Sequence, residues 1–259
     1  MFDIHTHILP GIDDGPKSLE ESLAAIAALV SEGVRGIVAT PHFNDQFPHV
    51  PAFEVQQRVA QLQREVDRQG IAVQLWAGHE VLFDTTVEAA LATGQAGSIN
   101  QGPYVLVELP TYEFPMTLPM VLGQLRTRGY IPVIAHVERY KPTQRDPNVL
   151  LPLIEAGMLL QITVSSFTGK FGKTAQQTAE TLMHRNMAHV LATDAHSLSL
   201  RRANLIAGLR AAEALVGPAR VRQMVEEVPL AIIQGARVAI PPVRHPSRTW
   251  ISTMLRRDR

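Results

Sequence analysis

Seven short apolar segments recur along the chain, and helical patterns lie between them. They fall at residues 2–5, 34–40, 71–77, 104–109, 131–136, 158–163 and 188–193. Most are rich in Val, Ile and Leu without strict polar alternation, which is typical of parallel strands covered on both faces. Strands that alternate with helices over short links predict βαβ units with right-handed crossovers. We therefore predict an α/β fold, a distorted (β/α)7 TIM-like barrel of parallel strands, with an open doubly wound sheet as the alternative.

The helical segments carry recognisable start and stop signals. Residues 18–33 begin with a capping box from Ser18 to Glu21 and end at Gly33, and residues 53–70 end on a glycine in the same way. Further helices are predicted near residues 85–93, 117–128, 147–156, 173–185 and 199–215. No linker rich in Pro, Gly or Ser divides this region, so we predict one barrel domain over residues 1–243.

Residues 244–259 form a basic C-terminal tail in which Trp250, Ile251, Met254 and Leu255 follow helical spacing. Such a tail can dock on an acidic partner, a neighbouring subunit or a membrane surface. Packing on the barrel itself, or disorder, is the interpretation that we favour.

Composition excludes several classes of function. Lys plus Arg and Asp plus Glu each number 24, so no excess charge attracts nucleic acid or an anionic membrane. There is no signal peptide and no apolar run near the roughly 18 residues of a transmembrane segment, so we expect a cytoplasmic protein. Cysteine is absent, which excludes disulfides, thiolate metal sites and a Cys nucleophile. Hydrolytic chemistry must then use metal-activated water, Ser, Thr or a carboxylate.

Polar side chains gather where the predicted strands end. The sequence places there His5, His7, His42, His79, Glu80, Glu108, His136, Glu138, Arg139, Asp194 and His196. The carboxyl ends of parallel barrel strands share one face, so these side chains should converge. A single histidine at a strand end is usually scaffolding, and Glu138 is interpreted as a surface or supporting group. Many crowded imidazoles and carboxylates, however, are costly to bury unless cations compensate them.

The candidate ligands outnumber the needs of one metal ion. They are His5, His7, Asp14, His42, Glu80, Glu108, His136, Asp194 and His196. One ion takes about four to six ligands. We therefore predict two or three divalent ions that share a carboxylate, and histidine with carboxylate suits Zn, Mn or Fe.

The strings DIHTHILPGIDDG, VATPHF, HVERY and ATDAH resemble the polymerase-and-histidinol-phosphatase (PHP) superfamily. They are most similar to the bacterial manganese-dependent tyrosine-protein phosphatases encoded with capsular and exopolysaccharide synthesis genes. The resemblance runs from Met1 to about Pro241. It implies that the nine residues bind Mn²⁺, or else Fe or Zn, with Glu80 as the bridging carboxylate. Arg139 and Arg201 would bind the substrate phosphate, and Val137 stands where the family usually has Pro.

The resemblance implies hydrolysis of phosphotyrosine by a metal-bound hydroxide, without a phosphoenzyme. The expected partner is a phosphotyrosyl protein, the C-terminal tail of a bacterial tyrosine kinase that regulates capsule and exopolysaccharide synthesis. This substrate would bring the cytoplasmic enzyme to the inner face of the membrane. No nucleic acid is expected to bind, and the sequence leaves homo-oligomerisation open.

Two loops carry aromatic residues that could pack on a phosphotyrosine ring. Tyr112 and Phe114 follow the fourth strand, and Phe167 and Phe171 follow the sixth. For Phe167 we favour packing within its own loop. The two loops would lie on the same face as the candidate metal ligands.

Three other functions remain alternatives. A PHP-type phosphoesterase could act on small phosphate monoesters, and a regulatory module could bind metal without turnover. An amidohydrolase barrel also begins with His-X-His, but the form with a carbamylated lysine needs Lys at a strand end. The lysines Lys17, Lys141, Lys170 and Lys173 do not end any predicted strand.

Overall fold

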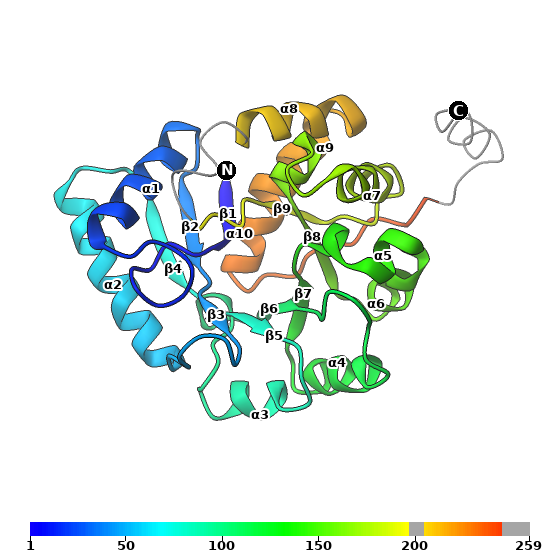
Figure 1. The fold of residues 1–259 in the computed structure, drawn as a ribbon, viewed down its shortest axis with the longest axis horizontal. Helices are drawn as coiled ribbons and strands as arrows, with labels where there is room; N and C mark the ends of the chain where they lie inside the picture. Colours follow the sequence, from blue (N-terminus) through cyan, green and yellow to red (C-terminus); the bar gives the residue numbers. More distant parts are fainter. Residues whose placement is uncertain (197–204, 245–259) are drawn as a thin grey trace.

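The computed structural model describes residues 1–196 and 205–244 (Figure 1). The strands are β1 Phe2–Thr6, β2 Gly36–Ala39, β3 His42–Phe43, β4 Gln74–Ala77, β5 Glu80–Leu82, β6 Tyr104–Glu108, β7 Ile131–Ile134, β8 Leu159–Thr163 and β9 Val190–Ala192. Every pairing between them is parallel. All seven predicted segments contain a strand, and the α/β fold is confirmed.

At two positions around the sheet, the strand is interrupted close to its carboxyl end. β1, β2 and β4 form one sheet, and β3, β5, β6, β7, β8 and β9 form another. β3 continues β2 after two residues, and β5 continues β4 in the same way. Gly78 N donates to Ala39 O at 2.9 Å and Glu80 N donates to Pro41 O at 3.1 Å across these breaks. The short strands β3 and β5 were not predicted.

The first and last strands also meet. Thr6 forms an isolated parallel bridge with Ala195, and His7 N donates to Ala195 O at 2.7 Å. The strands therefore follow one another around a ring, as a TIM-like barrel requires. Figure 1 shows them in the middle of the molecule with the helices around them.

The helices cover the outside of this ring. They are α1 Leu19–Ser31, α2 Ala52–Arg68, α3 Val87–Ala92, α4 Leu118–Thr127, α5 Lys141–Arg145, α6 Leu151–Glu155, α7 Lys173–His184, α8 Leu205–Val216, α9 Pro218–Arg222 and α10 Val228–Ile233. Short turns of other helical type are η1 Ile99–Gln101, η2 Val137–Arg139, η3 Pro147–Leu150, η4 Val164–Thr168 and η5 Gln223–Glu227. None of the described helices combines the length and the apolar composition that a bilayer crossing requires.

The predicted helices are present with small changes. Ser18 caps α1 by accepting from Glu21 N at 3.3 Å, and Gly33 follows this helix with a φ of 95°. The predicted helix 147–156 is divided into η3 and α6. The start of the predicted helix 199–215 lies outside the described residues, and so does most of the predicted tail. The short helices α5, α9 and α10 were not predicted.

The barrel interior is apolar at its amino end. Ile4, Leu106 and Val133 come from three strands and belong to one buried cluster with Ile232 of α10. Tyr104 begins β6, and its hydroxyl donates to Ala236 O at 2.7 Å just after α10. α10 therefore closes the amino ends of the strands.

Two helical glycines differ in the space around them. A Cβ on Gly208 of α8 would lie 2.5 Å from Val164 O, whereas a Cβ on Gly123 of α4 would meet nothing within 4 Å. We expect Gly208→Ala to lower the free energy of unfolding by about 1–3 kcal/mol through overpacking. Gly123→Ala should instead raise it by about 0.5–1 kcal/mol, because alanine costs less backbone entropy in a helix. Urea denaturation of both variants measures the difference, and equal midpoints would contradict it.

Candidate metal centre

The strand carboxyl ends bring all nine predicted ligands into one cluster. They surround or underlie a cavity of about 460 Å³. Its lining residues are Asp14, His42, Glu80, Glu108, Thr111, His136, Arg139, Tyr140, Asp194 and His196. His5 and His7 are buried at its base. The prediction that these nine side chains lie close together is therefore confirmed. Their binding of metal stays a prediction.

Glu80 lies at the centre of this cluster with 1% of its surface exposed. Its Oε2 is 3.2 Å from His5 Nε2, 3.2 Å from His7 Nε2 and 3.1 Å from His42 Nδ1. Its Oε1 is 2.8 Å from His136 Nε2. Burial opposes ionisation, but His5 and His136 hold the pKa of Glu80 well below its usual range. One carboxylate thus contacts four imidazoles, the arrangement expected of a bridging ligand.

Asp194 is a second shared carboxylate. Its Oδ1 is 3.5 Å from His5 Nε2, 3.6 Å from His7 Nε2 and 3.4 Å from His196 Nδ1. Its Oδ2 is 2.9 Å from Arg139 Nη2. Asp194 therefore connects the histidines at the base of the cavity to the arginine in its wall.

Two candidate ligands have left-handed backbone conformations. The φ angle is 32° at His136 and 53° at Asp194, values that are uncommon outside glycine. His136 N donates to Gln161 Oε1 at 3.0 Å, and Asp194 N donates to His5 O at 2.9 Å. These hydrogen bonds hold strained residues in place, which is a frequent property of functional sites.

The outer part of the cluster is formed by Asp14. Its side chain is 54% exposed, and its Oδ1 is 3.2 Å from His196 Nε2 and 3.6 Å from His42 Nε2. Ligand atoms within 4.8 Å of one another form three sets. The sets are His7, Asp14, His42 and His196; His5, His7 and Glu80; and His42, Glu80 and Glu108. Because the sets share members, they could hold two or three neighbouring ions.

The donor atoms fit divalent cations. The Nε2 atoms of His5 and His7 are 3.3 Å apart, and both face the same oxygen of Glu80. His42 Nδ1 is also close to that oxygen but lacks hydrogen-bond geometry. Imidazole nitrogens that converge on carboxylate oxygens are the ligands of Zn, Mn and Fe sites.

Protons occupy part of this donor set when no cation is bound. Burial alone would lower the pKa of His7, but its hydrogen bonds to Asp13 and Glu80 raise the pKa to about 10. Burial and the negative charge of Glu80 raise the pKa of Glu108 to about 8. Both groups must lose protons to ligate a metal, so proton binding competes with metal binding.

Asp13 supports the cluster by contacting His7 and His42, a role that was not predicted. Its Oδ2 lies 2.8 Å from His7 Nδ1 and accepts from His42 N at 3.1 Å, and its Oδ1 accepts from Gly15 N at 2.9 Å. Carboxylates that bond the outer nitrogen of a ligating histidine fix its ring and tautomer. The adjacent Asp-Asp pair in the sequence was the available signal.

Gln161 supports two further histidines. Its Oε1 is 3.0 Å from His5 Nδ1 and accepts from His136 N at 3.0 Å. Asp3 has a comparable structural role, since its Oδ1 accepts from Thr193 N at 3.1 Å just before Asp194. Each is a polar residue between two apolar neighbours in a strand, which was the signal that could have revealed it.

Arg139 is held in the cavity wall on two sides. Its Nη2 contacts Asp194, and its guanidinium carbon lies 4.6 Å from the centre of the Phe171 ring. Its backbone N donates to His136 O at 3.0 Å within η2, where Val137 is fully buried. The turn thus directs Arg139 toward the cluster with Val at position 137. The other predicted phosphate ligand, Arg201, lies outside the described residues.

Glu138 was interpreted as a surface or supporting group, and the surface interpretation is wrong. Its side chain is completely buried. Its Oε1 accepts from Ser166 Oγ at 2.6 Å and from Thr163 N at 3.2 Å. Glu138 therefore anchors the η2 turn, which carries Arg139, to the end of β8.

Two buried histidines lie outside the cluster. His79 Nε2 donates to Val50 O at 3.0 Å while its Nδ1 accepts from Gly97 N at 2.9 Å. His189 Nδ1 accepts from Leu160 N at 2.9 Å. Burial lowers the pKa of His79 to about 4 and that of His189 to about 3. Both are neutral groups that hold the scaffold together.

The aromatic residues of the two loops have different environments. Phe167 is 3% exposed, which confirms packing within the protein. Phe114 packs edge-on against Tyr140 with ring centres 5.8 Å apart. Tyr112, in contrast, is 72% exposed. Of these three, Tyr112 is the most accessible to another molecule.

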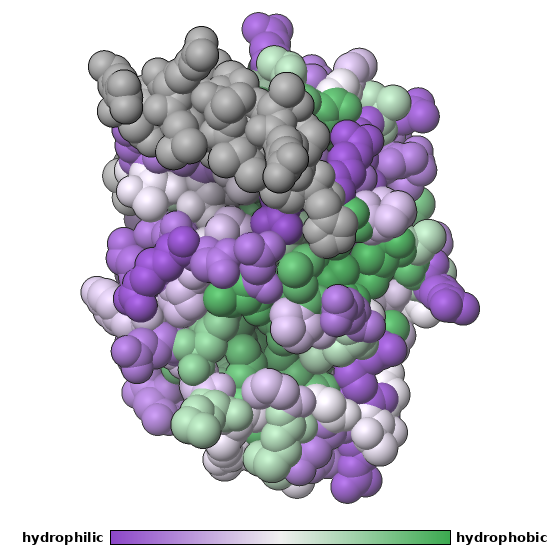
Figure 2. All heavy atoms as spheres, turned by 90° about the vertical axis from the view of Figure 1, so that its right-hand side faces the viewer, coloured by the Kyte–Doolittle hydropathy of each residue, from purple (hydrophilic) through white to green (hydrophobic). Residues whose placement is uncertain are grey.

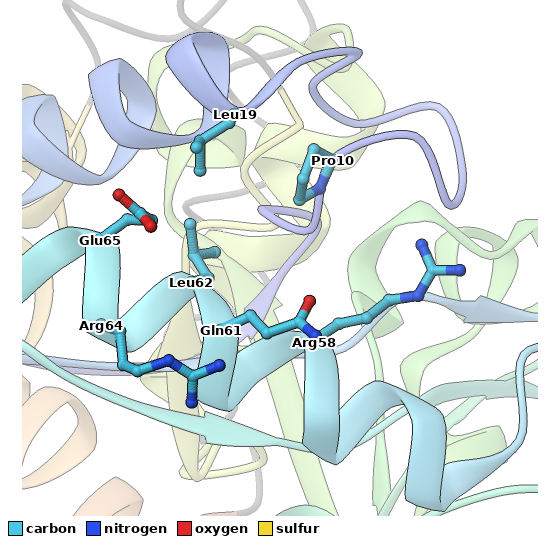
Figure 3. Close-up of a pocket in the computed structure, with 7 residues that line it drawn as sticks. All are labelled: Pro10, Leu19, Arg58, Gln61, Leu62, Arg64 and Glu65. Carbon is cyan, nitrogen blue, oxygen red and sulfur yellow. The ribbon is translucent and has the colours of Figure 1, made fainter.

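A second cavity lacks the clustered polar side chains of the candidate metal centre. It measures about 420 Å³ and lies between α2 and the segment that carries Pro10. Figure 3 shows Pro10, Leu19 and Leu62 near one another, while the guanidinium groups of Arg58 and Arg64 lie well apart. No polar groups converge in this hollow, so it has no comparable site chemistry.

Solved structures establish the class of fold. A phosphotriesterase homology protein from Escherichia coli superposes with a TM-score of 0.56 at 13% identity, covering 88% of this chain and 97% of that one. Histidinol phosphate phosphatase from Lactococcus lactis gives 0.53 at 15% identity, covering 83% and 92%. The chain therefore has the fold of these TIM-barrel-like hydrolases.

Sequence relatives define the family. The model of the family described as capsular polysaccharide synthesis, CpsB/CapC, matches residues 1–234. Tyrosine-protein phosphatase YwqE of Bacillus subtilis is 37% identical over 202 residues, and the putative tyrosine-protein phosphatase CapC of Staphylococcus aureus is 35% identical over 201. Each match covers 78% of this chain and 79% of the relative. The chain belongs to the CpsB/CapC family.

A solved structure of the same family agrees closely. It comes from the study of YwqE from Bacillus subtilis and CpsB from Streptococcus pneumoniae, which describes them as unique metal-dependent tyrosine phosphatases. It superposes with a TM-score of 0.90 at 31% identity and covers 96% of this chain and 100% of that one.

The hydrogen bonds of Asp13 lead to a prediction about the metal affinity of the cluster. We expect Asp13→Asn to weaken Mn²⁺ binding by about 10–100-fold, because His7 loses the carboxylate that orients it. Asp45→Asn is the matched control, since the Asp45 side chain is fully exposed in the same region of the fold. Isothermal titration calorimetry of the metal-free proteins measures both affinities. Unchanged affinity in Asp13→Asn would show that His7 needs no such support.

Proposed function

We propose that this chain is a metal-dependent protein-tyrosine phosphatase. The observation that carries the proposal is the contact of four imidazoles with Glu80 in a cavity whose wall holds Arg139. Family membership supports it, because the relatives are named tyrosine-protein phosphatases and the solved ones are described as metal-dependent.

The metal ions would be held by the nine clustered residues. These are His5, His7, Asp14, His42, Glu80, Glu108, His136, Asp194 and His196. We infer Mn²⁺ as the resident ion, with Fe or Zn as alternatives that the same ligands accept. When bound, such ions supply a hydroxide nucleophile near neutral pH and positive charge for the phosphate oxygens.

The protein's own groups bind and orient the phosphate. Arg139 presents a planar guanidinium, which matches two phosphate oxygens at once. Asp194 and the ring of Phe171 restrict its movement, so little side-chain freedom is lost when phosphate binds. Arg201 would add a second guanidinium. A tyrosine phenolate with a pKa near 10 leaves more readily than an alkoxide, so leaving-group protonation is less demanding.

The substrate class is a phosphotyrosyl protein. We infer that it is the C-terminal tail of a bacterial tyrosine kinase which regulates capsule and exopolysaccharide synthesis, in agreement with the description of the family. Such a substrate would place the enzyme in the cytoplasm at the inner face of the membrane. We further infer one catalytic domain over residues 1–243 and a separate basic segment over 244–259.

Phosphate release tests the proposed activity. We expect Mn²⁺-dependent release from a phosphotyrosyl peptide, abolished by chelator, with little release from a phosphoseryl peptide or a sugar phosphate. Release from the sugar phosphate alone would retain the metal centre and change the substrate class. Metal-loaded protein that released phosphate from none of them would support a binding module instead.

Arg139 can be tested separately from the metal. We expect Arg139→Lys to lower kcat/KM by about 100-fold, because lysine keeps the charge but loses the two-pronged contact with the phosphoryl group. Arg145→Lys is the control, since Arg145 is exposed on the neighbouring helix α5. Steady-state kinetics with metal analysis of each variant makes the comparison. Equal activity of the two variants would show that Arg139 takes no part in the reaction.

A further inference from the structure

Large apolar side chains are exposed in one segment beside the metal centre. Tyr112 is 72% exposed, Met116 is 100% exposed and Met120 is 55% exposed. They make up half of the six exposed large hydrophobic residues in the described part of the chain. We call residues 112–120 the rim segment. Exposed apolar groups that gather in this way mark interaction surfaces, and methionine adapts well to varied partners.

The rim segment is continuous with the wall of the cavity. Thr111 directly precedes it and lines the cavity, and Thr111 O accepts from Lys141 N at 2.8 Å. Phe114, within the segment, packs on Tyr140, which also lines the cavity. One side of the segment is therefore fixed beside the candidate active site, while Tyr112 and Met116 project into solvent.

We propose that the rim segment binds apolar side chains that flank the phosphotyrosine of a protein substrate. This inference rests on the proposed phosphatase function and adds a determinant of substrate choice to it. Glu113 is the only charged residue of the segment, so an apolar stretch of substrate fits it better than a charged one. A chain whose phosphotyrosine enters the cavity must pass close to its wall at Thr111, and the rim segment begins at the next residue.

The protein's own C-terminal segment is a less suitable occupant. Arg244 is the last described residue, and its N donates to Arg185 O at 2.8 Å in the connection between α7 and β9. That connection leads into the amino end of a strand, whereas Thr111 follows the carboxyl end of β6. Arg244 therefore lies at the opposite end of the barrel from Thr111.

A double substitution tests the proposal. We expect Met116→Ser with Met120→Ser to raise KM about tenfold for a phosphotyrosyl peptide with Leu on both sides of the phosphotyrosine. The kcat for this peptide should stay within twofold. Hydrolysis of p-nitrophenyl phosphate, which is too short to reach the segment, should also change less than twofold. A phosphotyrosyl peptide with Ser flanks should show a high KM with both proteins.

The control is Phe53→Ser, because Phe53 is 60% exposed near the start of α2 and lies outside the rim segment. It should leave the KM for both peptides unchanged.

An unchanged KM for the Leu-flanked peptide in the double variant would overturn the proposal. An equal loss of activity on p-nitrophenyl phosphate would overturn it as well. A fall in the molar mass of the double variant by light scattering would reassign the surface to a second copy of the chain. If the unmodified protein hydrolyses no phosphotyrosyl substrate, the proposed function itself has failed.

Discussion

The contact of one buried carboxylate with four imidazoles is the constraint on which the rest of this structure depends. Glu80 and its histidines bring charge and hydrogen-bonding capacity into a region that water hardly reaches. Burial of such groups is favourable only when partners compensate them. The fold supplies hydrogen-bond partners through the carboxylate of Asp13 and the neutral amide of Gln161, and divalent ions would supply the remaining charge.

The two ends of the barrel have different roles. At the amino ends of the strands, apolar residues and α10 form a closed, buried core. At the carboxyl ends, the breaks after β2 and β4 let short strands begin directly with His42 and Glu80. Left-handed residues at His136 and Asp194 turn the chain sharply where regular strand geometry would carry it past the site. Backbone strain at these two residues thus lies at the end where the chemistry is expected.

Much of this could be predicted from the sequence because it depends on local pattern. Apolar segments predicted seven of the nine strands in the described part of the chain, and the topology of parallel strands then placed distant polar residues together. Gln161 was missed because its partners His5 and His136 are far away in the sequence, whereas Asp13 was missed although His7 is nearby in the sequence. Glu138 was left between a surface and a supporting position, since nothing near it in the sequence indicates burial against β8. The five-residue helices α5 and α9 lack the length that makes periodicity visible.

The two scaffold histidines also set the behaviour of this fold in acid. His79 and His189 are neutral in the folded protein, because burial lowers their pKa values to about 4 and about 3. In the unfolded chain each would bind a proton near pH 6.5. The unfolded state therefore takes up more protons as the pH falls below about 6.5, and the folded state loses stability until it can bind them too, near pH 4 and below. Above pH 6.5 neither residue makes stability depend on pH, so these two histidines destabilise the fold only in acid.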